Sequence, residues 1–214
     1  EDGWGGMDCY GENVVAFNSG WRNIEWTSDG GATWNSDLLT PQDHYACPRA
    51  LALVDQESLL MSVRDRSFGF DELTSLVWHR LGYNCDMDYL GLPLEEVRYN
   101  DIFVLHSANT AWAVGDSGLF TMSQNPLTDD TWSELAFIDG RDLNAVFFLN
   151  PQKGWIVGDD GLIMFTDNGG LSWQLSESNT GLDIYDVHFT DENNGWVCGE
   201  DGIIMHTTTG GREY

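Results

Sequence analysis

The chain has 214 residues, 42% of them hydrophobic, and 35 acidic against 9 basic residues give a net charge of −26 at pH 7. This charge makes nucleic acid and anionic membrane surfaces poor partners. No apolar run approaches the roughly 20 residues of a transmembrane helix, and no signal peptide opens the chain, so we expect that any such peptide has already been removed. The composition favours an acidic protein of an extracytoplasmic compartment, whether periplasmic, cell-surface or secreted.

The first recognisable element is a turn, Thr27-Ser-Asp-Gly-Gly-Ala-Thr-Trp34, which returns as Thr166-Asp-Asn-Gly-Gly-Leu-Ser-Trp173. In third position, Asp or Asn can accept hydrogen bonds from the amides of the turn, and the glycines supply its positive φ angles. A weaker copy, Thr207-Thr-Thr-Gly-Gly-Arg-Glu-Tyr214, has Thr209 in place of the Asp. We expect the Trp side chains of the two full copies to be largely buried.

The next segments, Ala50–Val54, Leu59–Val63 and Val77-Trp78, are short and apolar and indicate strands, with Trp78 opening a fourth strand. Residues 79–99 then depart from any periodic pattern and are expected to form an insert.

Four cysteines are spread along the chain. We expect a disulfide between Cys47 and Cys85, because both lie in irregular segments that bracket one repeat unit and an oxidising exterior suits this chain. The alternative is a structural zinc site in which His44 and His79 complete the ligand set. Cys9 and Cys198 fall in predicted strands and are expected to be buried.

From residue 100 onward the chain repeats itself. Trp112-Ala-Val-Gly-Asp-Ser-Gly118 returns as Trp155-Ile-Val-Gly-Asp-Asp-Gly161 and as Trp196-Val-Cys-Gly-Glu-Asp-Gly202, with tryptophans 43 and 41 residues apart. Each copy follows a short β-branched and aromatic segment, and these segments are 100–105, 143–148 and 184–189. Four strands of about five residues fill such a period without room for a helix, which predicts a propeller blade.

The turns with two glycines are identified as Asp-boxes, also called bacterial neuraminidase repeats. Together with the Gly-Trp-x-Val-Gly element, the blades resemble the propeller family of photosystem II stability and assembly factors. This resemblance implies an all-β fold, a β-propeller of four-stranded antiparallel blades, of which the family usually has seven.

The blades can be counted by the aromatic residue expected in each of them, and the count is five. These aromatic residues are Trp34, Trp78, Trp132, Trp173 and Tyr214. We therefore expect one domain over residues 1–214, with blades at about 1–43, 44–99, 100–140, 141–182 and 183–214. The five blades either close imperfectly or form part of a larger propeller.

The acidic turns of the repeat form the candidate binding face, because such turns share one face of a propeller with the loops between blades. The candidate residues are Arg64, Asp65, Arg66, Asp116, Asp159, Asp160, Glu200 and Asp201. Carboxylates from neighbouring blades can bind a basic partner protein or a divalent cation such as Ca²⁺. Asp-Gly is equally a favoured hairpin turn that needs no function.

A non-catalytic scaffold is the function that these features favour, with a protein as partner and no cofactor. No Gly-Lys-Ser/Thr loop, Gly-x-Ser-x-Gly elbow or His-Glu-x-x-His motif occurs. The alternative is a carbohydrate-binding or sialidase-like, glycoside-cleaving propeller, since Asp-boxes occur in sialidases. For a carbohydrate partner, Trp4, Trp21 and Trp26 are the candidate stacking residues.

Overall fold

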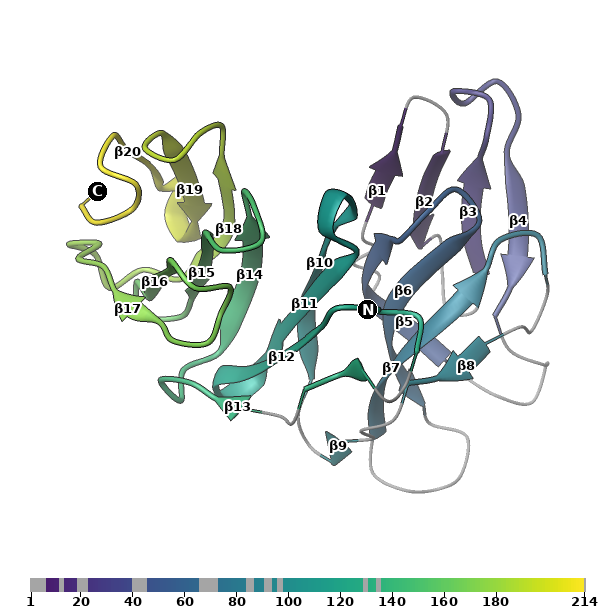
Figure 1. Ribbon diagram of the computed structural model, residues 1–214, viewed down its shortest axis with the longest axis horizontal. Coiled ribbons are helices and arrows are strands. Elements are labelled where there is room, and N and C mark those ends of the chain that lie inside the picture. Colours follow the sequence, from purple (N-terminus) through teal and green to yellow (C-terminus); the bar gives the residue numbers. More distant parts are fainter. Residues whose placement is uncertain are drawn as a thin grey trace.

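The structure is a computed structural model of the chain that describes residues 7–11, 14–18, 23–39, 46–65, 73–83, 87–90, 94–95, 98–128, 131–133 and 136–213. Five antiparallel sheets follow one another along the chain and stand side by side in an arc (Figure 1). We number these sheets blades 1 to 5. The first strands of successive blades contact each other, and the arc is open between blade 5 and blade 1.

Blades 1 and 2 form the N-terminal arm of the arc (Figure 1). Blade 1 contains β1 (Met7–Tyr10), β2 (Val14–Asn18), β3 (Asn23–Thr27) and β4 (Asn35–Leu38). Blade 2 contains β5 (Ala46–Leu53), β6 (Ser58–Asp65), β7 (Leu73–Arg80), β8 (Met87–Tyr89) and β9 (Leu94–Glu95). Both β8 and β9 pair with β7, so residues that follow the third strand return to the edge of the same sheet.

Blades 3 to 5 repeat one hairpin order more regularly. Blade 3 contains β10 (Tyr99–Leu105), β11 (Thr110–Gly115), β12 (Leu119–Ser123) and β13 (Ala136–Phe137). Blade 4 contains β14 (Leu143–Phe148), β15 (Gly154–Gly158), β16 (Ile163–Thr166) and β17 (Gln174–Leu175). Blade 5 contains β18 (Ile184–Phe189), β19 (Gly195–Gly199) and β20 (Ile204–Thr207).

The predicted all-β propeller architecture is confirmed. The helical segments with described bounds are 3₁₀ turns of three residues, and the predicted inner strands 143–148 and 184–189 coincide with β14 and β18.

The prediction that Trp78 opens a fourth strand is wrong. Trp78 lies inside the third strand β7, where it pairs with Leu60 of β6 and Asp88 of β8. Blade 2 carries no Asp-box, so only its position in the period located its strands.

The hydrophobic core consists of four layers, each between two neighbouring blades. Between blades 3 and 4, for example, Trp112 and Phe120 pack with Val146 and Phe148. Alternation along each strand sends one set of side chains toward the preceding blade and the other toward the following blade. A side chain of the repeat is therefore buried only where a neighbouring blade covers it.

The repeated tryptophans of blades 3 and 4 lie in these layers. Trp112 stacks on Phe148 of blade 4, with ring centroids 3.7 Å apart and planes 7° from parallel. Trp155 stacks on Phe189 of blade 5 at 3.5 Å and 8°. Each tryptophan thus packs against the inner strand of the following blade.

The same indoles are also hydrogen-bonded to the following Asp-box. Trp112 Nε1 donates to the carbonyl of Gly169 at 3.2 Å, and Trp155 Nε1 donates to the carbonyl of Gly210 at 3.0 Å. Buried indole N–H groups are usually paired in this way. The repeated tryptophan of one blade is therefore bonded to the Asp-box of the next blade. This bond occurs both between blades 3 and 4 and between blades 4 and 5.

Asp101 in β10 also connects blade 3 to blade 4. One carboxylate oxygen accepts a hydrogen bond from the N–H of Ile102, and the other accepts one from the N–H of Val146, both at 2.9 Å. Burial raises the pKa of Asp101 to about 7, more than these two hydrogen bonds lower it, and the charges of Asp186 and Asp8 add to the increase.

The free energy of unfolding is expected to fall as the pH rises from about 4 to about 7. The folded protein keeps a proton on Asp101 that the unfolded chain releases near the ordinary pKa of 3.8. At about 1.4 kcal/mol per unit, this group can account for up to about 4 kcal/mol. Urea unfolding between pH 4.5 and 7.5 should show that Asp101→Asn lacks this slope. A pH-independent difference between variant and wild type would contradict the assignment.

The Asp-box of blade 1 has the hydrogen bonds expected from its sequence. Asp29 accepts a hydrogen bond from the N–H of Thr33 at 2.9 Å and from its hydroxyl at 2.6 Å, and Thr27 donates to the same carboxylate at 2.7 Å. These bonds, those from Thr33 first, lower the pKa of Asp29 to about 2. Blade 5 keeps the turn with a hydroxyl instead, because Thr209 Oγ1 accepts a hydrogen bond from the N–H of Glu213 at 3.1 Å.

The prediction that Trp34 is buried is wrong, since its side chain is 48% exposed. Trp173, at the same position in blade 4, is half-buried and meets Phe120 and Phe148 edge-on at 5.5 and 6.0 Å. Phe120 belongs to blade 3, so the Asp-box tryptophan packs into the joint with the preceding blade. Blade 1 is the first blade among the described residues, so the joint that holds Trp173 has no counterpart for Trp34 there.

The expectation that Cys9 and Cys198 are buried is also wrong, because both are exposed free thiols. Cys198 stands in β19 at the position that Val157 holds in β15, where blade 5 covers it completely. Cys9 lies in β1, on the side that blade 2 does not cover. Both cysteines are exposed because they lie on the open outer faces of the last and first blades.

The predicted Cys47–Cys85 disulfide and the alternative zinc site remain predictions. Cys85 and His44 lie outside the described residues, and only the backbone of Cys47, in β5, is described. His79 is fully buried, and its Nε2 lies 3.2 Å from a carboxylate oxygen of Asp37 across the joint between blades 1 and 2.

Candidate functional site

Three acidic turns lie at one end of blades 3 to 5, between the second and third strands of each blade. They are Asp116–Gly118, Asp159–Gly161 and Glu200–Gly202. The middle residue of each turn has a positive φ, 56° at Ser117, 52° at Asp160 and 54° at Asp201. This left-handed conformation is accessible to Asn, Asp and similar short polar residues, which explains the choice of residues in the turns.

The turns are fixed to the following blade by their backbone. The N–H of Ser117 donates to Asp142 Oδ1 at 2.7 Å, and the N–H of Asp160 donates to Asp183 Oδ1 at 3.0 Å. Asp142 and Asp183 directly precede the inner strands β14 and β18. In blade 5, the equivalent N–H of Asp201 has no such acceptor among the described residues.

Two asparagines join the same turns to the next blade through their side chains. Asn100 Nδ2 donates to Asp116 Oδ1 at 3.0 Å and to the carbonyl of Leu143 at 3.1 Å. Asn144 makes the same pair of bonds with Asp159 Oδ1 at 2.9 Å and the carbonyl of Ile184 at 3.0 Å. Asp116 and Asp159 therefore have a structural role in the joints.

We call the carboxylates at this end of the blades the acidic rim. It consists of Asp116, Asp142, Asp159, Asp160, Asp183, Glu200 and Asp201. Burial, followed by the charges of Asp183, Asp142 and Asp160, raises the pKa of Asp159 despite the hydrogen bond from Asn144. Partial burial and four rim carboxylates, Glu200 foremost, raise the pKa of the exposed Tyr185 phenol. The rim is thus a negative surface with a neutral phenol beside it.

The predicted site contains two arginines, Arg64 and Arg66, and the structure describes only the backbone of Arg64. Arg64 and Asp65 end β6, which is the second strand of its blade, so their backbone lies at the same end of the fold as the acidic turns. Their side chains, and all of Arg66, lie outside the described residues. Two described arginines lie at the rim. The carbonyl of Arg98 accepts a hydrogen bond from the N–H of Asp116 at 2.9 Å, and Arg141 pairs with Asp139 through two hydrogen bonds and thereby lowers the pKa of that carboxyl.

Sequence reasoning missed the residues that hold the rim together. Asn100 and Asn144 are 44 residues apart, and Asp142 and Asp183 are 41 residues apart. Aligning the repeats on their inner strands, in addition to the tryptophans, would have found both pairs. Tyr185 could not be found in this way, because it replaces the asparagine of the other two blades.

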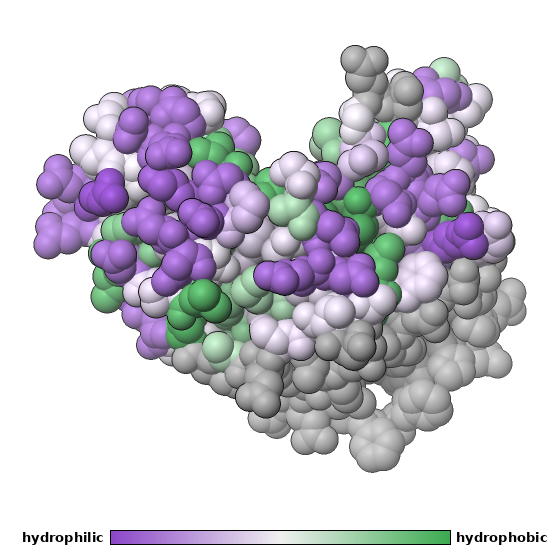
Figure 2. Space-filling model, in the orientation of Figure 1, coloured by the Kyte–Doolittle hydropathy of each residue, from purple (hydrophilic) through white to green (hydrophobic). Residues whose placement is uncertain are grey.

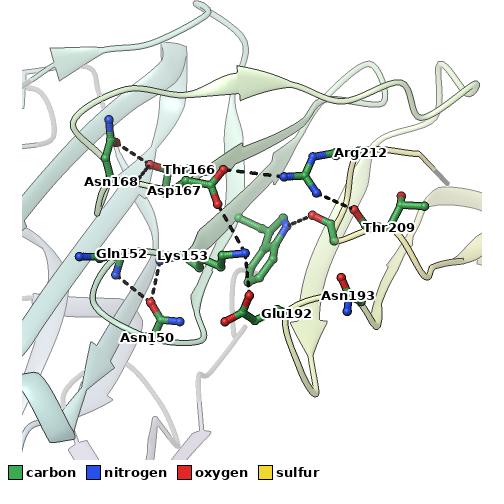
Figure 3. A network of polar contacts seen from close by, with 12 residues as sticks. Asn150, Gln152, Lys153, Thr166, Asp167, Asn168, Glu192, Asn193, Thr209 and Arg212 are labelled. Atoms are coloured by element: carbon green, nitrogen blue, oxygen red, sulfur yellow. Dashed lines mark hydrogen bonds and ion pairs between the residues drawn. The ribbon is translucent and has the colours of Figure 1, made fainter.

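At the opposite end of blades 4 and 5, a lysine and an arginine form ion pairs with carboxylates (Figure 3). Lys153, the single lysine of the chain, lies 2.9 Å from Glu192 Oε2 and 3.6 Å from Asp167 Oδ1. Arg212 lies 3.9 Å from the other oxygen of Asp167. The pairs Lys153–Glu192 and Arg212–Asp167 link blades 4 and 5, and each of these partly exposed pairs contributes about 0–1 kcal/mol.

A metal site is not assembled in the part of the chain that the structure describes. No group of three or more His, Cys, Asp or Glu side chains there has a geometry that could hold an ion. The described residues also include no helix with the length and apolar character required to span a bilayer.

The fold is that of a β-propeller in which blades 1, 4 and 5 carry Asp-box turns, and hydrogen bonds between blades 3, 4 and 5 fix the acidic rim. Residues 124–214 match the family profile of the photosynthesis system II assembly factor YCF48, which confirms the resemblance seen in the motifs. The match covers the last part of blade 3 and all of blades 4 and 5. No curated protein sequence matches the chain.

Solved structures show the same fold over nearly the whole chain. YCF48 bound to D1 peptide has 16% identity and a TM-score of 0.53, covering 95% of this chain and 76% of that one. YCF48 from Cyanidioschyzon merolae has 15% identity and a TM-score of 0.52, covering 94% and 81%. The WD40 β-propeller domain of Doa1 has 12% identity and a TM-score of 0.65, covering 95% and 64%.

Proposed function

We propose that this chain is a non-catalytic protein-interaction or assembly scaffold of an extracytoplasmic compartment, and that the acidic rim binds its partner. The observation that carries the proposal is the set of carboxylates held in fixed positions at one end of blades 3 to 5. The match of residues 124–214 to an assembly-factor family supports a protein partner, as does the relative bound to D1 peptide. A partner with a basic surface complements the rim.

Three rim side chains are available to a partner. Asp160, Glu200 and Asp201 are exposed, whereas Asp116 and Asp159 are bonded to asparagines. The backbone of the Asp160 turn is fixed by its hydrogen bond to Asp183, so the exposed carboxylate is presented without a large loss of backbone freedom on binding.

Replacing Asp160 and Asp201 by Asn and Glu200 by Gln should abolish partner capture without lowering the melting temperature, because none of these side chains bridges two blades. The test is affinity enrichment from the source organism with tagged wild type and tagged triple variant, followed by mass spectrometry of the retained proteins. Capture by the wild type should weaken as salt rises, since exposed charges are screened.

The matched control removes three exposed carboxylates from elsewhere, with Glu57, Glu177 and Glu213 each replaced by Gln. This control should retain the partner. Because both triple variants lose three negative charges, a difference in capture would come from the position of the carboxylates and not from the net charge. Equal capture by both triple variants would overturn the proposal. Selective binding to a glycan array, or release of sugar from a sialoside, would favour the carbohydrate alternative.

A further inference from the structure

The outer end of the joint between blades 3 and 4 holds an open pocket of about 510 Å³. Blades 3 and 4 are neighbours with four described strands each, so the pocket lies within a complete pair of blades and not at an end of the arc. Figure 2 shows hydrophobic surface in the region where β13 and β17 lie in Figure 1. The large apolar side chains that line the pocket include Phe120, Met122, Met164, Leu171, Trp173 and Leu175.

Two leucines of this lining are not required by the repeat. Leu171 is 83% exposed and Leu175 is 63% exposed, and the same positions in blade 1 hold Ala32 and Ser36. The hydrogen bonds of the Asp-box turn are made by other residues of the turn. A single exposed leucine is common on a protein surface, but two beside one apolar pocket extend it into a continuous apolar patch.

The same pocket reaches the acidic rim. Ile138 and Asp139 belong to its lining on the side of blade 3. The N–H of Ile138 donates to the carbonyl of Gly118, in a rim turn, at 2.8 Å. Arg141, the partner of Asp139, donates to the carbonyl of Asp160 at 3.4 Å. One surface therefore carries an apolar pocket and, beside it, the exposed carboxylate of Asp160.

This combination indicates the kind of ligand. A small apolar molecule inside the pocket would leave Leu171 and Leu175 in contact with water, whereas a polypeptide that lies across the pocket can cover both. Asp139 is already paired with Arg141, so Asp160 is the exposed carboxylate that a basic residue of the ligand can approach. A second copy of this chain is a poor occupant, because each copy carries a net charge of −26.

We propose that the partner of the acidic rim inserts a large apolar side chain into this pocket and pairs a neighbouring lysine or arginine with Asp160. This inference rests on the proposed rim function and adds the chemistry of the segment that binds. Apolar anchors that fill a pocket supply much of the affinity of protein interfaces, whereas exposed charge pairs mainly fix the orientation and the choice of partner.

The probe is a displayed library of random dodecapeptides, selected on the full chain at about 150 mM salt. The enriched peptides should share one large apolar residue and one lysine or arginine at a fixed spacing. A synthetic peptide of the enriched sequence should then bind the chain 1:1 in isothermal titration.

Variants of the two parts of the surface separate their contributions. Leu171→Ala combined with Leu175→Ser gives blade 4 the residues of blade 1, and should weaken binding of the selected peptide roughly tenfold or more at low and high salt. Asp160→Asn should cause a roughly threefold loss that disappears at high salt. All three side chains are exposed, so the variants should fold like the wild type. The control Met7→Ser with Ile204→Ser removes apolar side chains that are 76% and 74% exposed elsewhere, and should leave binding unchanged.

Methionine methyl resonances can locate the bound peptide. Met122 and Met164 line the pocket, whereas Met7 and Met205 lie in blades 1 and 5. Addition of the peptide to protein labelled at the methionine methyl groups should shift the signals of Met122 and Met164 and leave those of Met7 and Met205 in place.

Three results would overturn the proposal: no shared pattern among the enriched peptides, equal losses with the double leucine variant and its control, or methyl shifts that leave out Met122 and Met164. A loss with Asp160→Asn alone would overturn the pocket but leave the rim function intact. A loss with the leucine variant alone would overturn the pairing with Asp160 and the link to the rim. Self-association that the leucine variant abolishes, measured by sedimentation, would assign the pocket to a second copy instead.

Discussion

Replacing Trp112 by alanine is expected to lower the free energy of unfolding by about 3–5 kcal/mol, the range for deleting a large aromatic from a core. The side chain is fully buried, and its ring is stacked on Phe148. The variant also removes the hydrogen bond from Nε1 to the carbonyl of Gly169, leaving that carbonyl without its indole donor. Equilibrium urea unfolding, followed by circular dichroism, measures the change.

Trp34→Ala is the control for this experiment, because it removes the same side chain from an exposed site. With 48% of Trp34 exposed, the expected loss is below about 1 kcal/mol. Similar losses for the two variants would show that burial in a blade joint is not what makes Trp112 important.

Gly161→Ala is expected to be nearly as damaging as Trp112→Ala. Gly161 has a φ of +69°, and an added Cβ would lie 2.1 Å from the carbonyl oxygen of Thr180, in the connection to blade 5. The positive φ costs about 1–2 kcal/mol for a residue with a Cβ, and the clash adds about 1–3 kcal/mol. We therefore expect a total loss of about 2–5 kcal/mol.

Gly202→Ala separates these two effects. Gly202 has the same place in blade 5 and a φ of +76°, but an added Cβ meets no atom within 4 Å. The expected loss is therefore only about 1–2 kcal/mol, from the backbone conformation. Thermal or urea unfolding of the two variants measures the difference. If Gly202→Ala were as unstable as Gly161→Ala, contact with the next blade would not explain the requirement for glycine.

The strands of blades 3 to 5 could be predicted from the sequence because their pattern is local. Each repeat carries the alternation, the tryptophan and the turn glycines that set the pairing of its own strands, and β14 and β18 begin and end where the pattern predicts. Blade 2 lacks these signals. Its strands were placed by the repeat period alone, and Trp78 was assigned to the wrong strand.

The exposure of individual residues could not be predicted from the repeat motif. It depends on whether a neighbouring blade covers the residue, and the motif carries no information about that. Trp34 and Trp173 hold the same position in the same turn, yet one is exposed and the other is packed in a joint. Cys198 and Val157 differ in the same way. The acidic turns were located correctly, but Asn100 and Asn144, which hold them, were found only from the structure.

The bond between each indole and the following Asp-box has a consequence for synthesis on the ribosome. Trp112 precedes its acceptor Gly169 by 57 residues, and Trp155 precedes Gly210 by 55 residues. All strands of a blade have therefore been translated before the group that covers its tryptophan exists. Since chains emerge from the N-terminus and fold as they do so, the growing end of the nascent protein presents one uncovered tryptophan face after another, each until the next blade is complete.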